Sequence, residues 1–197
     1  MKLLNILLAL LLAFLTPLGR AQPPDKLQAI PQLDVSRYLG RWYEIAKYPN
    51  RFQQKCVADT SAYYTLRADG SLTVLNQCRL ADGTLYQAQG QARQLGGKQS
   101  AKLEVRFAPA WLSFLPFVWG NYWVIDLDEH YELAAVSEPS RQYLWILSRN
   151  STVDAASYTA LLHRLTGMGL DVQKLEKSKL SGSASISQSS QKQRVQS

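Results

Sequence analysis

The sequence contains few of the side chains that build catalytic or metal-binding sites. It has only two cysteines and two histidines in 197 residues. The two histidines, His130 and His163, are isolated and lack the spacing of metal ligands. There is no Cys-x-x-Cys motif, and no nucleophile has a suitable base close to it in sequence. We therefore expect no metal, no cofactor and no enzymatic activity. An acidic group at Asp126, Asp128 and Glu129 is better explained as turn chemistry.

Clusters of lysine and arginine are also missing, so nucleic acid is not an expected partner. The formal net charge is +7, and it falls to +5 once Lys2 and Arg20 are removed with the segment described next. A charge of this size is compatible with an ordinary solvated surface. The alternative is attraction to an anionic surface such as phospholipid headgroups or lipopolysaccharide.

No apolar run reaches the ~20 residues that a membrane-spanning helix needs. The longest, from Leu3 to Leu15, follows Lys2 and precedes Gly19-Arg20-Ala21. This order of charge, apolar core and small residues is typical of a secretory signal peptide, which we place at residues 1–21. The mature protein is then exported, to the periplasm or to the medium. No cysteine lies near the cleavage site to carry a lipid anchor, and contact with an outer membrane is left open.

The two cysteines, Cys56 and Cys78, form an even pair in a chain that is expected to be exported. One disulfide is the simplest prediction, because disulfides persist in oxidising compartments. A reactive thiol is the alternative, although neither cysteine has a histidine close to it in sequence.

Short runs of alternating apolar and polar residues begin at Gly40 and are separated by turn signals. Leu103, Val105 and Phe107, for example, alternate with charged residues. Turn sequences such as Ala68-Asp69-Gly70-Ser71 and Ala81-Asp82-Gly83 separate neighbouring runs. The pattern predicts an all-β fold, an eight-stranded up-and-down antiparallel barrel that leaves no free sheet edge. The expected strands are 41–48, 57–67, 71–79, 84–95, 101–107, 121–127, 131–137 and 142–149.

One C-terminal α-helix is expected after the last strand. Ser151 or Thr152 can cap it, Asp154 suits its first turn, and Gly167 or Gly169 can end it. The apolar side chains that would face the barrel are Tyr158, Leu161, Leu162 and Leu165. An extended run is expected at 171–175, and the barrel domain as a whole at 36–177. The Pro- and Gln-rich leader at 22–35 would cross the mouth or the base of the barrel, and the Ser/Gln-rich tail at 178–197 is predicted to be disordered.

The first and last strands carry a pair of residues suited to closing the barrel. Gly40 permits a tight turn as the first strand begins, and Trp42 follows two residues later. Arg149 ends the last strand, where its guanidinium can stack on the tryptophan and donate to nearby carbonyls. These three residues predict a structural clasp at the base of the barrel.

The clasp residues, the strand at 121–127 and the run at 143–149 together resemble the lipocalin family, and within it the Blc and apolipoprotein D-like group. The resemblance covers about residues 35–175. It implies a barrel that holds small hydrophobic ligands, such as fatty acids or lysophospholipids, and serves their storage or transport for membrane maintenance. In this group the matching positions Gly40, Trp42 and Arg149 close the base.

An eight-stranded barrel is just wide enough to hold one small ligand. The side chains expected to line its interior and to contact that ligand are Leu103, Val105, Phe107, Tyr122, Val124, Tyr143 and Trp145. The alternative for each of them is that it fills the core. Tyrosine hydroxyls or basic side chains at the mouth would then meet a polar headgroup.

The connection between the fifth and sixth strands, residues 110–119, is far more apolar than an ordinary loop. Its large side chains are Trp111, Phe114, Phe117 and Trp119. In an up-and-down barrel this loop lies at the same end as the first connection, which in lipocalins is the open end. It could contact a membrane, form a homodimer or cover a ligand, or it could pack as core.

Three functions are compatible with these features. A carrier of small hydrophobic ligands is favoured, a lipid-modifying enzyme on the same fold is a second possibility, and an interaction module with a filled barrel is a third.

Overall fold

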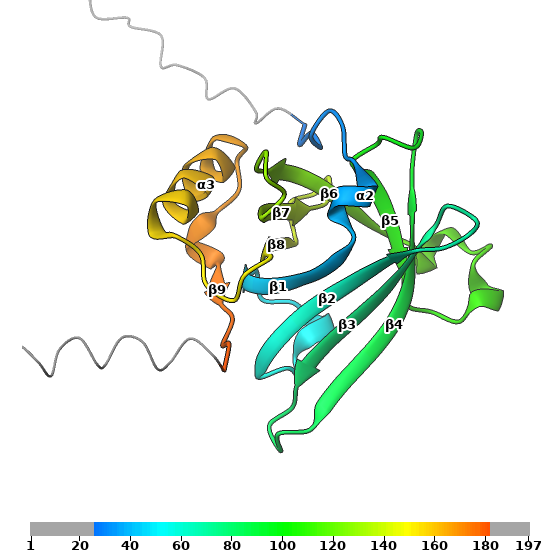
Figure 1. Cartoon of the computed structure of the whole chain (residues 1–197), viewed down its shortest axis with the longest axis horizontal. Coiled ribbons are helices and arrows are strands. Elements are labelled where there is room, and N and C mark those ends of the chain that lie inside the picture. Colours follow the sequence, from blue (N-terminus) through cyan, green and yellow to red (C-terminus); the bar gives the residue numbers. More distant parts are fainter. Residues whose placement is uncertain (1–25, 182–197) are drawn as a thin grey trace, which may run out of the picture.

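The computed structural model describes residues 26–181, which form a closed antiparallel β-barrel with one long helix packed against its outside (Figure 1). Each of the first seven strands pairs with the next, and β1 pairs with both β8 and β2, which closes the barrel. The strands are β1 (Gly40–Lys47), β2 (Ala58–Leu66), β3 (Leu72–Arg79), β4 (Leu85–Gln94), β5 (Lys102–Arg106), β6 (Gly120–Leu127), β7 (Leu133–Ser137) and β8 (Leu144–Ser148). All eight predicted strands are confirmed, and their ends lie within two residues of the predicted ones. The predicted signal peptide at 1–21 lies outside the described residues.

Asx-type turns close the hairpins that the sequence marked. Between β2 and β3 the carboxylate of Asp69 accepts from the backbone N–H of Ser71, and Gly70 has a φ of 81°. The turn between β3 and β4 repeats this arrangement with Asp82, Gly83 and Thr84. A glycine suits these positions because a positive φ strains any residue that carries a Cβ.

Helix α3 (Ala155–Gly167) lies on one side of the barrel (Figure 1). The prediction that Ser151 or Thr152 caps it is wrong, because Asp154 is the N-cap and accepts from the backbone N–H of Ser157. An aspartate here also interacts favourably with the positive end of the helix dipole. The helix ends in a Schellman motif, in which Gly169 has a φ of 78° and Leu170 donates to the carbonyl of Leu165.

Leu161 and Leu165 of α3 are completely buried against the outer face of β1, β6, β7 and β8. Asp126 of β6 also contacts the helix. Its two carboxylate oxygens accept from Nε and Nη2 of Arg164 at 2.7 and 2.8 Å. The sequence placed Asp126 among solvated turn acids, and the structure corrects this, since its side chain is only 10% exposed. The pair holds the helix against the barrel.

The segment after α3 differs from the sequence prediction. Residues 172–174 form the short 3-10 helix η4 (Val172–Lys174), not an extended run, and the extended pairing comes later at β9 (Glu176–Lys177). Strand β9 pairs with the end of β1, beyond the point where β2 separates from it. Ser178 and Ser181, the first part of the predicted tail, hydrogen-bond to Glu44 and Asp59. This C-terminal strap, residues 176–181, therefore bridges the gap between β1 and β2.

The disulfide between Cys56 and Cys78 is confirmed, with the two Cα atoms 5.5 Å apart. Cys56 belongs to the connection between β1 and β2, and Cys78 is a buried residue near the end of β3. The bond ties this connection to the barrel wall.

Candidate functional site

The base of the barrel is closed by a cation–π contact between its ends. The guanidinium of Arg149 lies 4.1 Å from the centre of the Trp42 ring, and Trp42 is completely buried. Arg149 also donates to the backbone carbonyls of Arg37, Arg41 and Tyr131. Gly40 has a φ of 90°, and a Cβ there would lie 3.4 Å from Nη1 of Arg149. The predicted clasp residues are thus brought together at the base.

The leader crosses the base, one of the two ends that the sequence left open. Leu33 is completely buried, and the short helix α2 (Val35–Tyr38) follows with Asp34 as its N-cap. Tyr38 of this helix packs against Trp42, with ring centroids 4.7 Å apart, and its backbone carbonyl accepts from the indole N–H. Since β1 starts at this base, the opposite end is the open one, and it carries the connections that follow β1, β3, β5 and β7.

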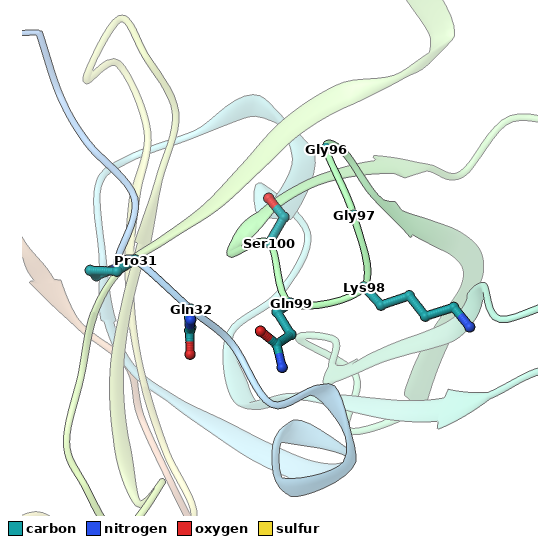
Figure 2. Close-up of a pocket in the computed structure, with 7 residues that line it drawn as sticks. All are labelled: Pro31, Gln32, Gly96, Gly97, Lys98, Gln99 and Ser100. Carbon is teal, nitrogen blue, oxygen red and sulfur yellow. The ribbon is translucent and has the colours of Figure 1, made fainter.

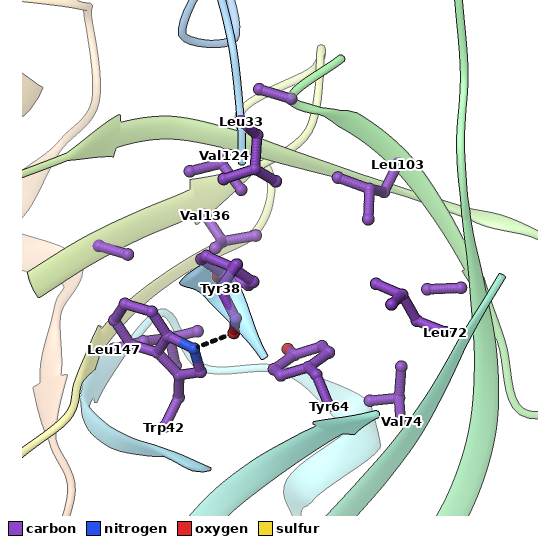
Figure 3. Packing of buried hydrophobic residues seen from close by; sticks show 13 residues of the cluster. Leu33, Tyr38, Trp42, Tyr64, Leu72, Val74, Leu103, Val124, Val136 and Leu147 are labelled. Carbon is purple, nitrogen blue, oxygen red and sulfur yellow. Dashed lines mark hydrogen bonds between the residues drawn. The ribbon is translucent and has the colours of Figure 1, made fainter. Parts of the chain in front are cut away.

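The interior above the base is apolar. Side chains from every part of the barrel wall point toward a common centre (Figure 3). Leu103 and Val124, both predicted ligand contacts, are 1% and 0% exposed. Neighbouring side chains cover them, so in this structure these two residues pack in the core.

Higher in the barrel, several inward-facing residues keep exposed area. Register places Ala62 opposite Trp42, and Ala88 opposite Asn76 in the next strand pair. Ala62, Ala88, Val105 and Tyr122 are all only partly buried although they face inward. A filled core would cover these positions. These partly exposed inner positions, which include the alanines of β2 and β4, border the upper interior of the barrel toward the mouth, and this region is called the chamber below.

Three tyrosine hydroxyls form the floor of this chamber. The hydroxyl of Tyr122 is 2.8 Å from that of Tyr38 and 2.9 Å from that of Tyr64. Burial is the largest cause that raises the pKa of all three, to about 12 for Tyr64 and well above the usual value for the other two. All three hydroxyls therefore stay protonated at neutral pH. Only Tyr122 was predicted from the sequence.

A second polar cluster lies near the mouth. Trp145 donates from its indole nitrogen to Oε1 of Gln53 at 3.0 Å, and Nε2 of Gln53 donates to Glu44. Glu44 is 3% exposed, and burial, the largest cause, raises its pKa against the opposing effect of hydrogen bonds from Ser178 and Gln53 and of the Lys47 charge. Lys47 faces the same side as Trp145. Lys47 also lies 3.6 Å from a carboxylate oxygen of Glu176 in the C-terminal strap, so the cluster combines hydrogen-bond donors with a cation that already has a counter-ion.

Tyr143 and Trp145, two further predicted ligand contacts, stack with their ring centroids 5.8 Å apart. Phe52, from η1 (Arg51–Gln53) in the first connection, packs on Tyr143 at 5.4 Å. Phe107, just beyond β5, covers Gly90 of the neighbouring strand, where a Cβ would lie 2.8 Å from its ring. Phe107 remains 43% exposed, which fits a position at the rim of the chamber.

The loop between β5 and β6 projects its rings into solvent. Trp111, Phe114 and Phe117 are 73%, 75% and 79% exposed. These values exclude the alternative that the whole loop packs as core. Trp119 differs from the other three, because its ring lies under the guanidinium groups of Arg93 and Arg106 and its indole donates to the carbonyl of Ser113. Trp119 anchors the loop, and the other three rings form its exposed tip, which lies away from α3 (Figure 1).

Two grooves lie outside the chamber. One, of about 590 Å³, is bounded by the leader and the β4–β5 turn at the closed end (Figure 2). Its lining residues are Pro31, Gln32, Gly96, Gly97, Lys98, Gln99 and Ser100, which are polar or small and offer no apolar wall. The other, of about 270 Å³, lies between the C-terminal strap and the upper parts of β1 and β2. Neither suits an apolar ligand.

Within residues 26–181, no three His, Cys, Asp or Glu side chains come close enough to hold a metal ion. None of the helices in this part of the chain has the length and hydropathy needed to cross a membrane.

Several residues of the chamber were not found from the sequence. These residues are Tyr38, Tyr64, Glu44 and Gln53, and they are distant in sequence from the predicted contacts. For Glu44 a signal exists: it occupies the same alternating face as Trp42, where an acidic residue is unexpected. Tyr64 similarly alternates with Ala62 on the inner face of β2.

An antiparallel β-barrel that is closed at the base, apolar inside and partly exposed on its inner face toward the other end has the architecture of a binding calyx. The chain belongs to the lipocalin family, because the model of the lipocalin-like domain matches residues 33–180. Membership of this family supports the binding of small hydrophobic ligands. Lipocalins are generally binding and transport proteins, which is consistent with a protein that is not an enzyme.

Curated relatives support this assignment. The chain is 42% identical to temperature-induced lipocalin-1 of Arabidopsis thaliana over 154 residues, which cover 77% of this chain and 82% of the relative. It is 39% identical to the outer membrane lipoprotein Blc of Escherichia coli over 176 residues, or 88% and 95% of the two chains. Apolipoprotein D of Mus musculus is 36% identical over 149 residues, or 72% and 74%.

Solved structures show the same fold at low sequence identity. Insecticyanin from the tobacco hornworm Manduca sexta superposes with a TM-score of 0.60 at 19% identity, covering 78% of this chain and 84% of that chain. Lobster apocrustacyanin A1 gives 0.58 at 14% identity, covering 74% and 79%.

Proposed function

We propose that this protein is an exported carrier that binds one fatty acid, lysophospholipid or similar molecule in the barrel and serves maintenance of the cell envelope. The observation that carries the proposal is the partly exposed inner face formed by Ala62, Ala88, Val105 and Tyr122 above a closed base. Export is supported by the N-terminal sequence and by the relative named as an outer membrane lipoprotein.

Burial of an acyl chain supplies the affinity in this proposal. Each CH₂ group transferred from water contributes about 0.8 kcal/mol, so about ten of them contribute roughly 8 kcal/mol. That free energy corresponds to a Kd of about 1 μM before other gains and losses. A carboxylate or phosphate head would remain at the mouth, where Lys47, Gln53 and Tyr143 can meet it.

Filling the chamber tests this proposal. Ala88→Trp places a large ring on the inner face of β4, whereas Gln89→Trp places the same ring on the outer, exposed face of the same strand. We expect the inner variant to lose at least about tenfold in affinity for a lysophospholipid, and the outer variant to bind as the wild type does. Equal binding by all three proteins, with unchanged thermal unfolding, would refute the chamber.

We also propose that the exposed tip of the β5–β6 loop contacts a lipid surface. Trp111, Phe114 and Phe117 place three large rings in solvent at the open end of the barrel, where a ligand would enter or leave. Exposed rings of this size mark interaction sites, and tryptophan favours the interface between water and lipid. A ligand could then pass between the chamber and a membrane without crossing water.

Binding to vesicles of phosphatidylethanolamine and phosphatidylglycerol tests the lipid contact. Trp111→Ser combined with Phe114→Ser should weaken vesicle co-sedimentation several-fold and leave thermal unfolding unchanged. Leu66→Ser removes an apolar side chain that is 55% exposed at the other end of the barrel, and it should have no effect. Unchanged sedimentation of the loop variant excludes the lipid contact, and loss of a dimer in the same variant would assign the loop to self-association.

A further inference from the structure

The three tyrosines at the chamber floor come from separate parts of the chain, namely α2, β2 and β6. The Tyr122 hydroxyl lies between the other two, and no other hydrogen-bond partner of the three hydroxyls is present among residues 26–181. Three hydroxyl protons are thus available for two hydrogen bonds. One O–H donor is always left over, and a buried donor without an acceptor costs about 1–3 kcal/mol.

The central position of the Tyr122 hydroxyl lets it accept from both of the others, which leaves its own proton free. Tyr38 and Tyr64 are 1% and 4% exposed, whereas Tyr122 is only partly buried. In the arrangement that suits these positions, Tyr38 and Tyr64 both donate to the oxygen of Tyr122. The proton of Tyr122 then points to whatever occupies the space above it.

The floor has no charge to offer. No hydrogen bond among the described residues joins the three hydroxyls to a charged side chain. Arg149, whose charge acts on Tyr38, stacks on Trp42 and uses its donors on backbone carbonyls. A carboxylate placed at the floor would therefore lose its hydration without gaining a counter-ion, which is costly in an apolar interior. A neutral oxygen needs only the one free donor.

We propose that the hydroxyl of Tyr122, held by Tyr38 and Tyr64, is a polar subsite for a neutral oxygen acceptor, such as a ketone, ester or alcohol, at the deep end of an apolar ligand. This inference rests on the proposed binding function and specifies its ligand class. Such a molecule enters with its neutral oxygen first. A fatty acid, in contrast, enters with its methyl end first and leaves its carboxylate at the mouth, where Lys47 lies.

Competition between matched ligands tests the subsite. A 2-alkanone and an n-alkane of equal chain length displace a bound apolar fluorescent probe, and the ratio of their affinities reports the hydrogen bond. In the wild type we expect the ketone to bind about fivefold more tightly, which is the net effect of one hydrogen bond. Tyr122→Phe should bring this ratio close to one.

The double variant Tyr38→Phe/Tyr64→Phe is the matched control, because it removes the same two hydrogen bonds but keeps the Tyr122 hydroxyl. It should retain the preference for the ketone. A ratio near one in the wild type, or an unchanged ratio in Tyr122→Phe, overturns the subsite while binding of the alkane still supports the chamber. Failure of every ligand and of the probe to bind the wild type overturns both proposals.

Discussion

Reduction of the disulfide should destabilise the barrel by an amount that its loop length sets. Cys56 and Cys78 are separated by 22 residues in the sequence, and the segment between them contains all of β2. Closing a loop of this length removes conformational entropy from the unfolded chain. The chain-entropy relation gives about 3 kcal/mol of stabilisation at 25 °C.

Urea denaturation with and without a reductant measures this quantity on one and the same sequence. We expect the free energy of unfolding to fall by about 3 kcal/mol on reduction, and the dependence on urea to steepen because the reduced unfolded chain is more expanded. The variant Cys56→Ala/Cys78→Ala is the control, since the reductant should not change its stability. A loss below about 1 kcal/mol would contradict the entropic reasoning. Alkylation of both thiols in the unreduced native protein would contradict the bond itself.

Three further predictions concern charged residues of the barrel and of helix α3. Arg149→Lys keeps the charge but loses the planar guanidinium that donates to three backbone carbonyls. Urea denaturation should therefore show a free energy of unfolding that is lower by about 2 kcal/mol. For the control Arg79→Lys, in an exposed ion pair, the decrease should be less than about 0.5 kcal/mol. Burial raises the pKa of Glu44, so the folded state binds this proton more tightly than the unfolded state does. The free energy of unfolding should therefore fall as pH rises above 4.5, the usual pKa of a glutamate. Glu44→Gln should flatten this part of the stability–pH curve, and an equally steep curve would contradict the role of Glu44. Arg164→Leu leaves Asp126 without its ion-pair partner, so amide hydrogen exchange in α3 should become faster while exchange in the strands stays unchanged. An equal change in helix and strands would show that the ion pair does not hold α3 on the barrel.

The sequence predicted the barrel well because alternation and turn chemistry are local signals. The carboxylates of Asp69 and Asp82 and the positive φ of the following glycines close turns within a few residues. The N-cap of α3 was not predicted correctly, because several neighbouring residues give the same local signal. Ser151, Thr152 and Asp154 are all good N-caps, and only the three-dimensional start of the helix selects the aspartate.

The chamber was harder to predict because the exposure of its inner face depends on several strands at once. Leu103 and Val124 follow the inward alternation correctly, yet they lie at a level where the barrel is filled. Whether an inward side chain meets a ligand or a neighbour depends on the sizes of side chains opposite to it. Here the small residues are Ala62 and Ala88, and no motif singles them out.

The polar contacts of the site join segments that are far apart in the chain. Tyr38 and Tyr122 meet across 84 positions, and Glu44 and Ser178 meet across 134 positions. No local pattern encodes such pairs, because each residue alone is compatible with many surroundings. The sequence-based resemblance supplied the class of ligand but not these contacts.

Native mass spectrometry of the protein purified from its own source tests the central claim most directly. We predict a complex with one small hydrophobic molecule per chain, which Ala88→Trp loses and Gln89→Trp keeps. A wild-type protein that carries no such molecule, and that takes up none when lysophospholipid or fatty acid is added, would contradict the carrier function.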